Sequence, residues 1–262
     1  MPVPQTKPRL RKREIILAVA AGGIAAATAA AILDDDNDGA FGPRVEVVVN
    51  EDFSKLAPFT SVSSVGPQDV VITYGDTQSV EARGSDEARA LIGVSVDNGV
   101  LKIRPRVDGW QWNWGGVQHI TYYVTVPRLE RVTMEGSGDI RVDKVEGDAF
   151  AGRIEGTGDL TIGMLKVDRA NFEIEGTGSI TAAGTAGDTQ VSIGGPGDVI
   201  ARDLQSRTAT VTVNGPGDAK LNVTQVAAVS VNGPGDVDIT GSARCSVTQN
   251  GPGDVDCEGG TN

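Results

Sequence analysis

The chain has 262 residues, a formal net charge of −12 at pH 7, only 4% aromatic residues and two cysteines. A surface this acidic repels phosphate backbones, so the composition argues against nucleic-acid binding. The length suffices for a substantial core, and the scarcity of aromatic rings suits a narrow interior filled by Val, Ile and Ala.

The first 33 residues read as an export or anchoring segment. A basic stretch, residues 1–14, precedes an uncharged, Ala-rich run of 19 residues, Ile15 to Leu33, which is predicted to be a hydrophobic helix. Basic residues stay on the cytoplasmic side of a membrane, so the body of the chain is expected outside the cytoplasm. Two alternatives remain open: a signal peptide cleaved near Ala29, or an uncleaved single-span anchor. Residues 34–43, which are rich in Asp, are predicted to be a flexible linker.

Residues 44–130 contain strand-like runs without a regular repeat, and we interpret them as irregular first coils and an N-terminal cap of the domain 44–262. Turns are marked by Gly75-Asp76 and by Asp97-Asn98-Gly99. The apolar, β-branched runs are Val45–Val49, Val70–Tyr74, Val100–Ile103 and Ile120–Val126.

All three tryptophans of the chain lie within this segment, at alternate positions: Trp110, Trp112 and Trp114. Trp rings stack on sugar faces and carry an N–H donor, so a glycan-binding platform is one hypothesis. The alternative, which we favour, is that the rings cover an end or a flank of the fold. The only histidine, His119, is expected to be structural rather than catalytic.

Seven copies of a Gly-x-Gly-Asp-like tetrapeptide follow at intervals of 18–20 residues, within residues 131–262. Apolar residues alternate with polar ones on both sides of each copy, which predicts short, half-buried strands. A fixed period of this length is too short for a propeller blade and indicates stacked coils. We therefore predict an all-β fold, a right-handed parallel β-helix with two or three short strands per coil. The copies begin at Gly136, Gly156, Gly176, Gly195, Gly215, Gly233 and Gly251.

A second turn is expected about eleven residues after each tetrapeptide, near Gly147-Asp148, Val167-Asp168 and Gly187-Asp188. The Asp that closes the tetrapeptide recurs evenly, which is typical of a turn-forming residue rather than a catalytic one. One carboxylate per coil supplies few of the six to eight oxygen ligands that calcium requires. The sequence therefore predicts no catalytic residue, no metal site and no cofactor.

A second polar column stands just before the tetrapeptide. It is Glu in the early coils, at Glu135, Glu155 and Glu175, and becomes Asn in the later ones. Stacked Asn side chains form amide ladders along a parallel stack, so we expect this column to stabilise the fold. The later members are Asn214, Asn232 and Asn250.

The two cysteines, Cys245 and Cys257, lie near the C-terminal end of the chain. In an exported protein such a pair is a plausible disulfide, which would staple the last coils. Both occupy repeat positions that hold Ala, Leu or Ile in earlier coils, so two small buried side chains are the alternative.

Three runs precede the regular coils in a fixed order: FTSVSSVGPQDVVI, VDNGVLKIRP at Val96–Pro105, and ITYYVTVPRLERVTMEGSGDI at Ile120–Ile140. Together with the repeated tetrapeptide, over roughly residues 45–257, this combination resembles the putative auto-transporter adhesin, head GIN domain family of exported bacterial proteins. The resemblance implies a right-handed parallel β-helix behind an export signal, and the family name suggests adhesion. It supplies no catalytic residues, and the Trp-rich run departs from the family pattern.

The sequence thus favours a non-enzymatic β-helix of the cell envelope, a binding or structural module with a glycan or another cell-surface partner. Contact with the membrane is expected through the N-terminal segment only. The alternative is a polysaccharide-processing enzyme, a lyase or glycosidase, that uses carboxylates on the surface of the same scaffold. The oligomeric state is not indicated by the sequence.

Overall fold

The computed structural model describes residues 15–16, 30–31, 52–106 and 120–260, and the chain divides into two compact units, Met1–Asp52 and Phe53–Asn262. In the first unit, β1 (Ile15–Ile16) pairs antiparallel with β2 (Ala30–Ala31). The predicted hydrophobic helix and the linker otherwise fall outside the described residues. Within the described part of the chain, no helix is both long and apolar enough to cross a membrane.

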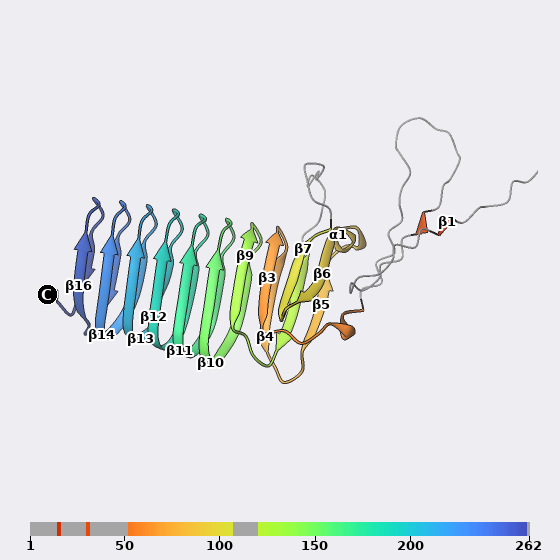
Figure 1. Cartoon of the computed structure of the whole chain (residues 1–262), viewed down its shortest axis with the longest axis horizontal. Coiled ribbons are helices and arrows are strands. Elements are labelled where there is room, and N and C mark those ends of the chain that lie inside the picture. Colours follow the sequence, from red (N-terminus) through yellow and green to blue (C-terminus); the bar gives the residue numbers. More distant parts are fainter. Residues whose placement is uncertain (1–14, 17–29, 32–51, 107–119, 261–262) are drawn as a thin grey trace, which may run out of the picture. The chain divides into compact units, whose positions relative to one another are not determined.

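The second unit is a parallel β-solenoid (Figure 1), as the repeat predicted. Its regular coils are joined in one ladder in which each strand pairs in parallel with the equivalent strand of the next coil. The strands of the regular coils are β9 (Arg131–Gly136), β10 (Ile140–Ile154), β11 (Leu160–Ile174), β12 (Ile180–Ile193), β13 (Val199–Val213), β14 (Ala219–Val231), β15 (Val237–Thr240), β16 (Arg244–Gln249) and β17 (Val255–Cys257).

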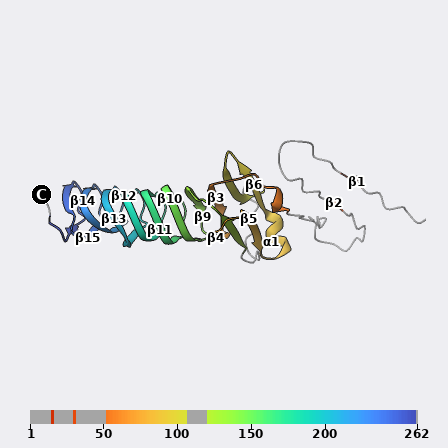
Figure 2. The ribbon, with the colours of Figure 1, turned by 90° about the horizontal axis from the view of Figure 1, so that it is seen from below.

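Each complete coil is one long strand that bends, rather than the two or three short strands that we predicted. In β10 the alternation of inward and outward side chains is interrupted at Asp143–Lys144 and again at Glu146–Ala149. The pairing with β11 omits Asp143 and Asp148, so the predicted second turn is a bend within a continuous ladder. Seen from below, the bent parts of successive coils lie side by side (Figure 2).

The interior is built from the apolar columns that flank the tetrapeptide. Met134, Ile154, Ile193 and Val213, each two residues before a tetrapeptide, are 0–1% exposed. Stacking brings each of these side chains against its equivalent in the next coil, so one continuous aliphatic core runs through the solenoid. The polar residues between them point outward, as period-two alternation requires.

The glycines of the tetrapeptide permit close stacking of the turns. A Cβ atom on Gly217 would lie 2.0 Å from the carbonyl oxygen of Gly197 in the preceding coil. A Cβ atom on Gly195 would lie 2.2 Å from the carbonyl oxygen of Gly176. Any side chain at these positions would therefore force neighbouring coils apart, which explains why glycine recurs there independently of backbone angle.

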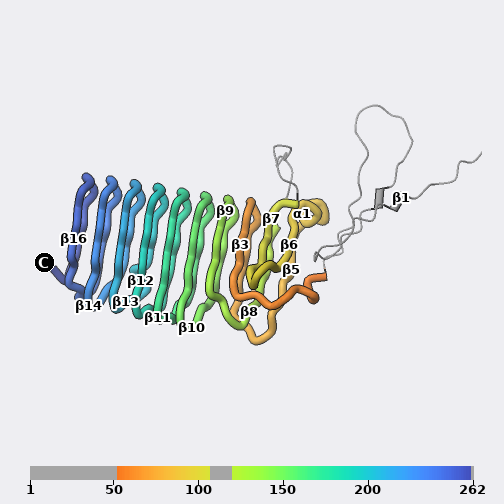
Figure 3. Tube along the Cα trace, in the orientation of Figure 1, coloured from red at the N-terminus to blue at the C-terminus, as the bar shows by residue number. Residues whose placement is uncertain are grey.

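At the N-terminal end the coils are not stacked in sequence order. The ladder runs β7–β3–β9, so the first coil of the chain lies between two later ones. Figure 3 shows the orange β3 between the yellow β7 and the green β9. Likewise β4 lies between β8 and β10. The strands are β3 (Ser61–Gly66), β4 (Asp69–Tyr74), β5 (Ser79–Arg83), β6 (Ile92–Asp97), β7 (Val100–Pro105) and β8 (Thr121–Val126).

Antiparallel strands and a short helix complete this end. The strands β6 and β7 form a hairpin whose two-residue turn, Asn98-Gly99, has positive φ at both positions, as a type I′ turn requires. The helix α1 (Asp86–Leu91) starts at Ser85, whose hydroxyl accepts the amide N–H of Ala88 at 3.2 Å. A single 3-10 turn, η1 (Phe53–Lys55), precedes the first coil. The sequence pattern predicted neither helix.

Candidate functional site

The aspartates of the tetrapeptide form hydrogen bonds between coils. The carboxylate of Asp218 accepts the backbone N–H of Asp236 at 2.9 Å, and that of Asp198 accepts the N–H of Asp218 at 2.8 Å. These carboxylates therefore hold neighbouring turns together, which is a structural role. The same bond is made to the N–H groups of Asp139, Asp159, Ser179 and Asp254, at 2.8–3.1 Å.

Two members of the glutamate column, Glu155 and Glu175, share one arginine with the neighbouring Glu173. Arg153 lies 2.5 Å from Glu155, 2.5 Å from Glu173 and 3.0 Å from Glu175. Hydrogen bonds to Glu155 and then Glu173 raise the pKa of the Arg153 guanidinium further above its ordinary value. The arrangement ties two coils together at the surface. It leaves no pair of carboxylates in this group that is free of a basic partner.

In the later coils the same column is an amide ladder, as predicted. The Nδ2 of Asn232 donates to Oδ1 of Asn214 at 2.8 Å, and Nδ2 of Asn250 donates to Oδ1 of Asn232 at 2.9 Å. Each bond uses one of the two amide hydrogens and one of the oxygen lone pairs. The exposed Asn side chains are therefore held in place while part of their hydrogen-bonding capacity stays available.

The outer face that carries these columns changes character along the solenoid. It consists of β9, the second halves of β10 to β14, and β16, which stand in one row (Figure 1). In its early coils the outward positions carry Arg131, Arg153 and the Glu side chains described above. From β12 onward, the three aligned outward positions nearest the tetrapeptide hold only uncharged residues, whereas the position two residues before them holds Asp188 in β12 and Arg244 in β16.

We call this uncharged part the neutral face and define it by the outward side of four aligned segments. The middle position of each segment is Ser or Thr, as at Thr212 and Ser230. Sequence analysis identified its Asn column but missed the face as a whole, although the aligned columns contain the signal. The four segments are Gln190–Gly194, Thr210–Asn214, Ala228–Asn232 and Ser246–Asn250.

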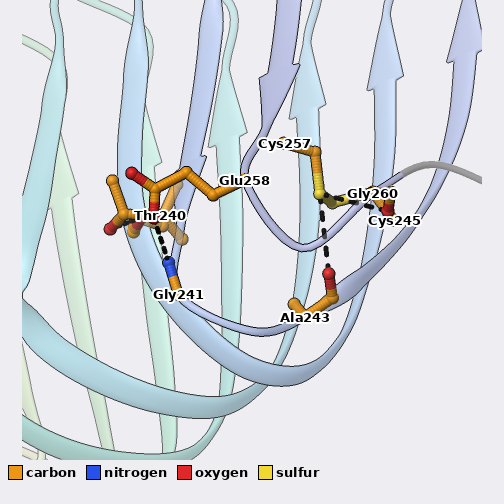
Figure 4. Close-up of a disulfide and its surroundings, with 8 residues drawn as sticks. Thr240, Gly241, Ala243, Cys245, Cys257, Glu258 and Gly260 are labelled. Carbon is orange, nitrogen blue, oxygen red and sulfur yellow. Dashed lines mark hydrogen bonds between the residues drawn. A yellow bond between two sulfur atoms is a disulfide. The ribbon is translucent and has the colours of Figure 1, made fainter.

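The last coil is closed by a disulfide between Cys245 of β16 and Cys257 of β17, with the two Cα atoms 6.5 Å apart (Figure 4). Two hydrogen bonds hold the chain around it. The N–H of Cys245 donates to the carbonyl of Gly260 at 3.0 Å, and the N–H of Gly241 donates to the carboxylate of Glu258 at 3.0 Å. The bridge thus joins two strands of the terminal coil.

The structure does not describe the other residues that the sequence singled out. Trp110, Trp112, Trp114 and His119 fall outside the described residues. Among the described residues, no group of three or more His, Cys, Asp or Glu side chains has a geometry that could hold a metal ion. The exposed apolar side chains of Tyr74 and Met164 were not anticipated, because each follows another exposed residue and so breaks the alternation of its strand.

A continuous parallel ladder, a packed aliphatic interior and outward polar columns define the class of this protein as a β-solenoid built from short coils. Residues 58–243, more than half of the chain, match the family described as "Putative auto-transporter adhesin, head GIN domain". The chain belongs to this family, as the sequence resemblance indicated. Among curated proteins, none matches the chain.

Solved structures share the fold. A "putative adhesin" from Bacteroides fragilis superposes with a TM-score of 0.71 at 21% identity, covering 79% of this chain and 94% of that one. A "putative adhesin" from Parabacteroides distasonis gives 0.60 at 18% identity, with the same two coverages. A "putative lipid binding protein" from Parabacteroides distasonis gives 0.61 at 18% identity, also covering 79% and 94%. At these identities the likeness establishes the fold.

Proposed function

We propose that this protein is a non-enzymatic, adhesin-like module of the cell envelope, which binds a glycan or another cell-surface partner through its outer faces. The observation that carries the proposal is the structural use of the repeated carboxylates. The side chains of Asp198 and Asp218 accept backbone N–H groups, and Glu155 and Glu173 pair with Arg153. The side chains of the regular columns therefore stabilise the stack of coils, and the outer faces of the solenoid are available for recognition.

The alternative enzyme, a lyase or glycosidase, needs a pair of carboxylates with separated roles as acid and base. The aspartate column instead repeats one environment from coil to coil, so no member is set apart for a second role. A lipid ligand, suggested by the name of one structural relative, needs an apolar cavity or groove. The interior here is occupied by closely stacked side chains such as Ile193 and Val213.

The experiment is a glycan array probed with the purified full chain, with a parallel turnover assay on every glycan that is retained. We expect binding without any change in the length or saturation of the glycan. Release of shortened or unsaturated products would overturn the non-enzymatic part of the proposal. Replacing Trp112 with Ala in the same assay tests whether the Trp-rich run contributes to binding or only to stability.

Family membership also supports an exported location, and the basic and apolar N-terminal segment supplies the proposed route. A reporter fused after Asn262 is expected to be active only outside the cytoplasm, with the chain retained in the membrane fraction. A soluble product that starts near Ala30 would favour signal cleavage over anchoring. Reporter activity inside the cytoplasm would contradict both forms of the proposal.

A further inference from the structure

The neutral face is anomalous for this protein. The chain carries a net charge of −12, with 22% charged residues, and the same columns of the same sheet hold Arg and Glu in β9 to β11. From β12 to β16 every outward position of the neutral face is uncharged. Charged side chains such as Arg207, Lys220 and Asp238 occur in these coils outside the neutral face, and Asp188 and Arg244 border it on the same side of the sheet. The same three columns are also uncharged in β3, at Ser61, Ser63 and Val65, so the neutral face is the longest uninterrupted uncharged stretch on this side, over four consecutive coils.

The groups on this face are ordered by the backbone. Neighbouring coils of a parallel stack are about 4.8 Å apart, and alternate residues of a strand are separated by roughly 6.6 Å. Thr212 lies in register with Ser192 and Ser230, and Thr210 with Gln190 and Ala228. The face therefore presents a regular grid of hydroxyl and amide groups, about 14 Å by 13 Å across. Beneath it, the inward residues of the same strands, such as Val211 and Val213, are 0% exposed and hold the grid in place.

From these features we infer that the neutral face is the surface with which this protein binds an uncharged polysaccharide, an inference that rests on the proposed function. Hydroxyl and amide groups both donate and accept hydrogen bonds, and so do the hydroxyl groups of sugars. The Asn ladder holds Asn214 and Asn232 in position, which lowers the entropy lost when a ligand is bound. Small residues such as Gly194 and Ala228 leave the sugar rings room to approach the sheet.

The negative charge of the protein determines which class of polymer it can bind. An acidic protein repels anionic polymers at long range, so nucleic acids and acidic glycans are disfavoured wherever they approach. A neutral polymer meets no repulsion, and at the neutral face it displaces no tightly hydrated ion. A repeating partner also matches a repeating surface, because each sugar unit along the chain can meet equivalent groups of successive coils. These properties together favour an uncharged polysaccharide over an anionic polymer or a lipid.

The test measures binding of the full chain to cellulose, mannan and dextran, with polygalacturonate as the charged comparison. Thr212→Glu and Ser230→Glu each place a charge in the middle column of the neutral face. Thr181→Glu is the matched control, since Thr181 is exposed on the first half of β12, outside the neutral face. Thr212→Val removes the hydroxyl group at nearly constant volume, and Thr212→Ser keeps it. Thermal unfolding of each variant shows whether the fold is intact.

We expect binding to at least one of the uncharged polysaccharides and weaker or no binding to polygalacturonate. Thr212→Glu and Ser230→Glu should weaken that binding at least tenfold, with Thr181→Glu and Thr212→Ser within twofold of the native chain. The loss of binding in Thr212→Val should lie between twofold and tenfold. Equal effects of Thr181→Glu and Thr212→Glu would overturn the inference, because they would show a non-specific effect of charge.

The outcomes separate this inference from the proposed function. Glycan binding that survives both Thr212→Glu and Ser230→Glu would overturn the inference and leave the proposed function standing. Loss of glycan binding in Trp112→Ala alone would place the binding site outside the neutral face and would also overturn the inference. Tighter binding of an isolated envelope protein than of any polysaccharide, unaffected by Thr212→Glu, would also overturn it. Failure to bind any glycan or surface component would contradict both proposals.

Discussion

The carboxylate of Asp198 accepts the backbone N–H of Asp218, at 2.8 Å, across two neighbouring coils. Asp218 in turn accepts the N–H of Asp236. The repeated aspartate, which the sequence indicated to be a turn-forming residue, thus also connects the turns of neighbouring coils. Each such bond supplies a contact between coils that the backbone of the tight Gly-Pro-Gly turn does not make by itself.

Replacing Asp218 tests this role. Asp218→Ala leaves the N–H of Asp236 without its acceptor and is expected to lower the free energy of unfolding by about 1 kcal/mol. Asp218→Asn keeps an acceptor oxygen and removes one of several like charges in the column, so its stability should stay within about 0.5 kcal/mol of the native protein. Urea denaturation of both variants measures the difference. Equal losses for Ala and Asn would show that charge, rather than the hydrogen bond, is the relevant property.

The inward columns should tolerate no charge. Val213 is 0% exposed, so Val213→Asp buries an unpaired carboxylate and should cost at least about 3 kcal/mol. Thr212→Asp, one residue earlier on the outward side of β13, is the matched control and should change stability by less than about 0.5 kcal/mol. Thermal unfolding followed by circular dichroism compares them. Similar melting temperatures would contradict the assignment of inside and outside.

Two adjacent glycines should respond in opposite ways to the same change. A Cβ atom on Gly195 would lie 2.2 Å from the carbonyl oxygen of Gly176, whereas on Gly194 the nearest atom, the carbonyl oxygen of Ile174, is 3.8 Å away. Gly195→Ala is therefore expected to separate two coils and to cost about 1–3 kcal/mol. Gly194→Ala should be neutral or slightly stabilising, because it restricts the unfolded chain. Denaturant midpoints distinguish the two, and a neutral Gly195→Ala would show that the stack can expand locally.

The inward and outward faces were predictable because a strand has a side-chain period of two. Alternation around each tetrapeptide placed Ile154, Ile193 and Val213 inside, and the structure confirms it. The same alignment predicted the amide ladder from Asn214 to Asn250, since residues at one repeat position must stack in a parallel solenoid.

The order of the first coils was not predictable in this way. Alternation fixes which face a residue occupies but not which strand lies beside it. The segment Gly66-Pro67-Gln68-Asp69 is a degenerate eighth copy of the tetrapeptide, with Gly66 in register with Gly136. Gln68 replaces the second glycine and donates to the hydroxyl of Ser64 at 2.9 Å, inside the solenoid. Because of this substitution, the copy was not recognised when the repeats of the chain were aligned.

The candidate site was predicted only in part. The Asn column was visible, but recognising the neutral face requires the three outward columns to be compared between early and late coils at once. The neutral face begins where Glu173 and Glu175 of β11 are replaced by Ser192 and Gly194 in the next coil. This change is informative only once the strands are known to stack. The Trp hypothesis lies outside the described residues and stays a prediction.

The amide ladder should contribute unequally along its length. Asn232 donates to Asn214 and accepts from Asn250, so Asn232→Ala removes two side-chain bonds and should cost about 1–2 kcal/mol. Asn250→Ala removes one and should cost about half as much. Chemical denaturation of both single variants and of the double variant measures the coupling. Additive losses would contradict a cooperative ladder, because the bond from Asn250 to Asn232 is shared by the two changes.

The last prediction concerns the disulfide of Cys245 and Cys257, which are separated by 12 residues in the sequence. Closing a loop of this length restricts the unfolded chain by about 2–3 kcal/mol in the chain-entropy account. In a solenoid each coil contacts only its neighbours, so the loss should be concentrated in the terminal coil. In the Cys245→Ala/Cys257→Ala variant, the amides of β16 and β17 should exchange hydrogen at least tenfold faster, and those of β12 should be unchanged.

Alanine suits position 245, because Cys245 is fully buried and aligns with Ala227 of β14, and it is accommodated at position 257 because Cys257 is only partly buried. Reduction of the native chain without substitution is the control, and it should reproduce the faster exchange in β16 and β17. Faster exchange that extended equally into β12 would show that the terminal coil supports the whole stack. Unchanged exchange in β16 would show instead that the aliphatic core alone holds the last coil in place.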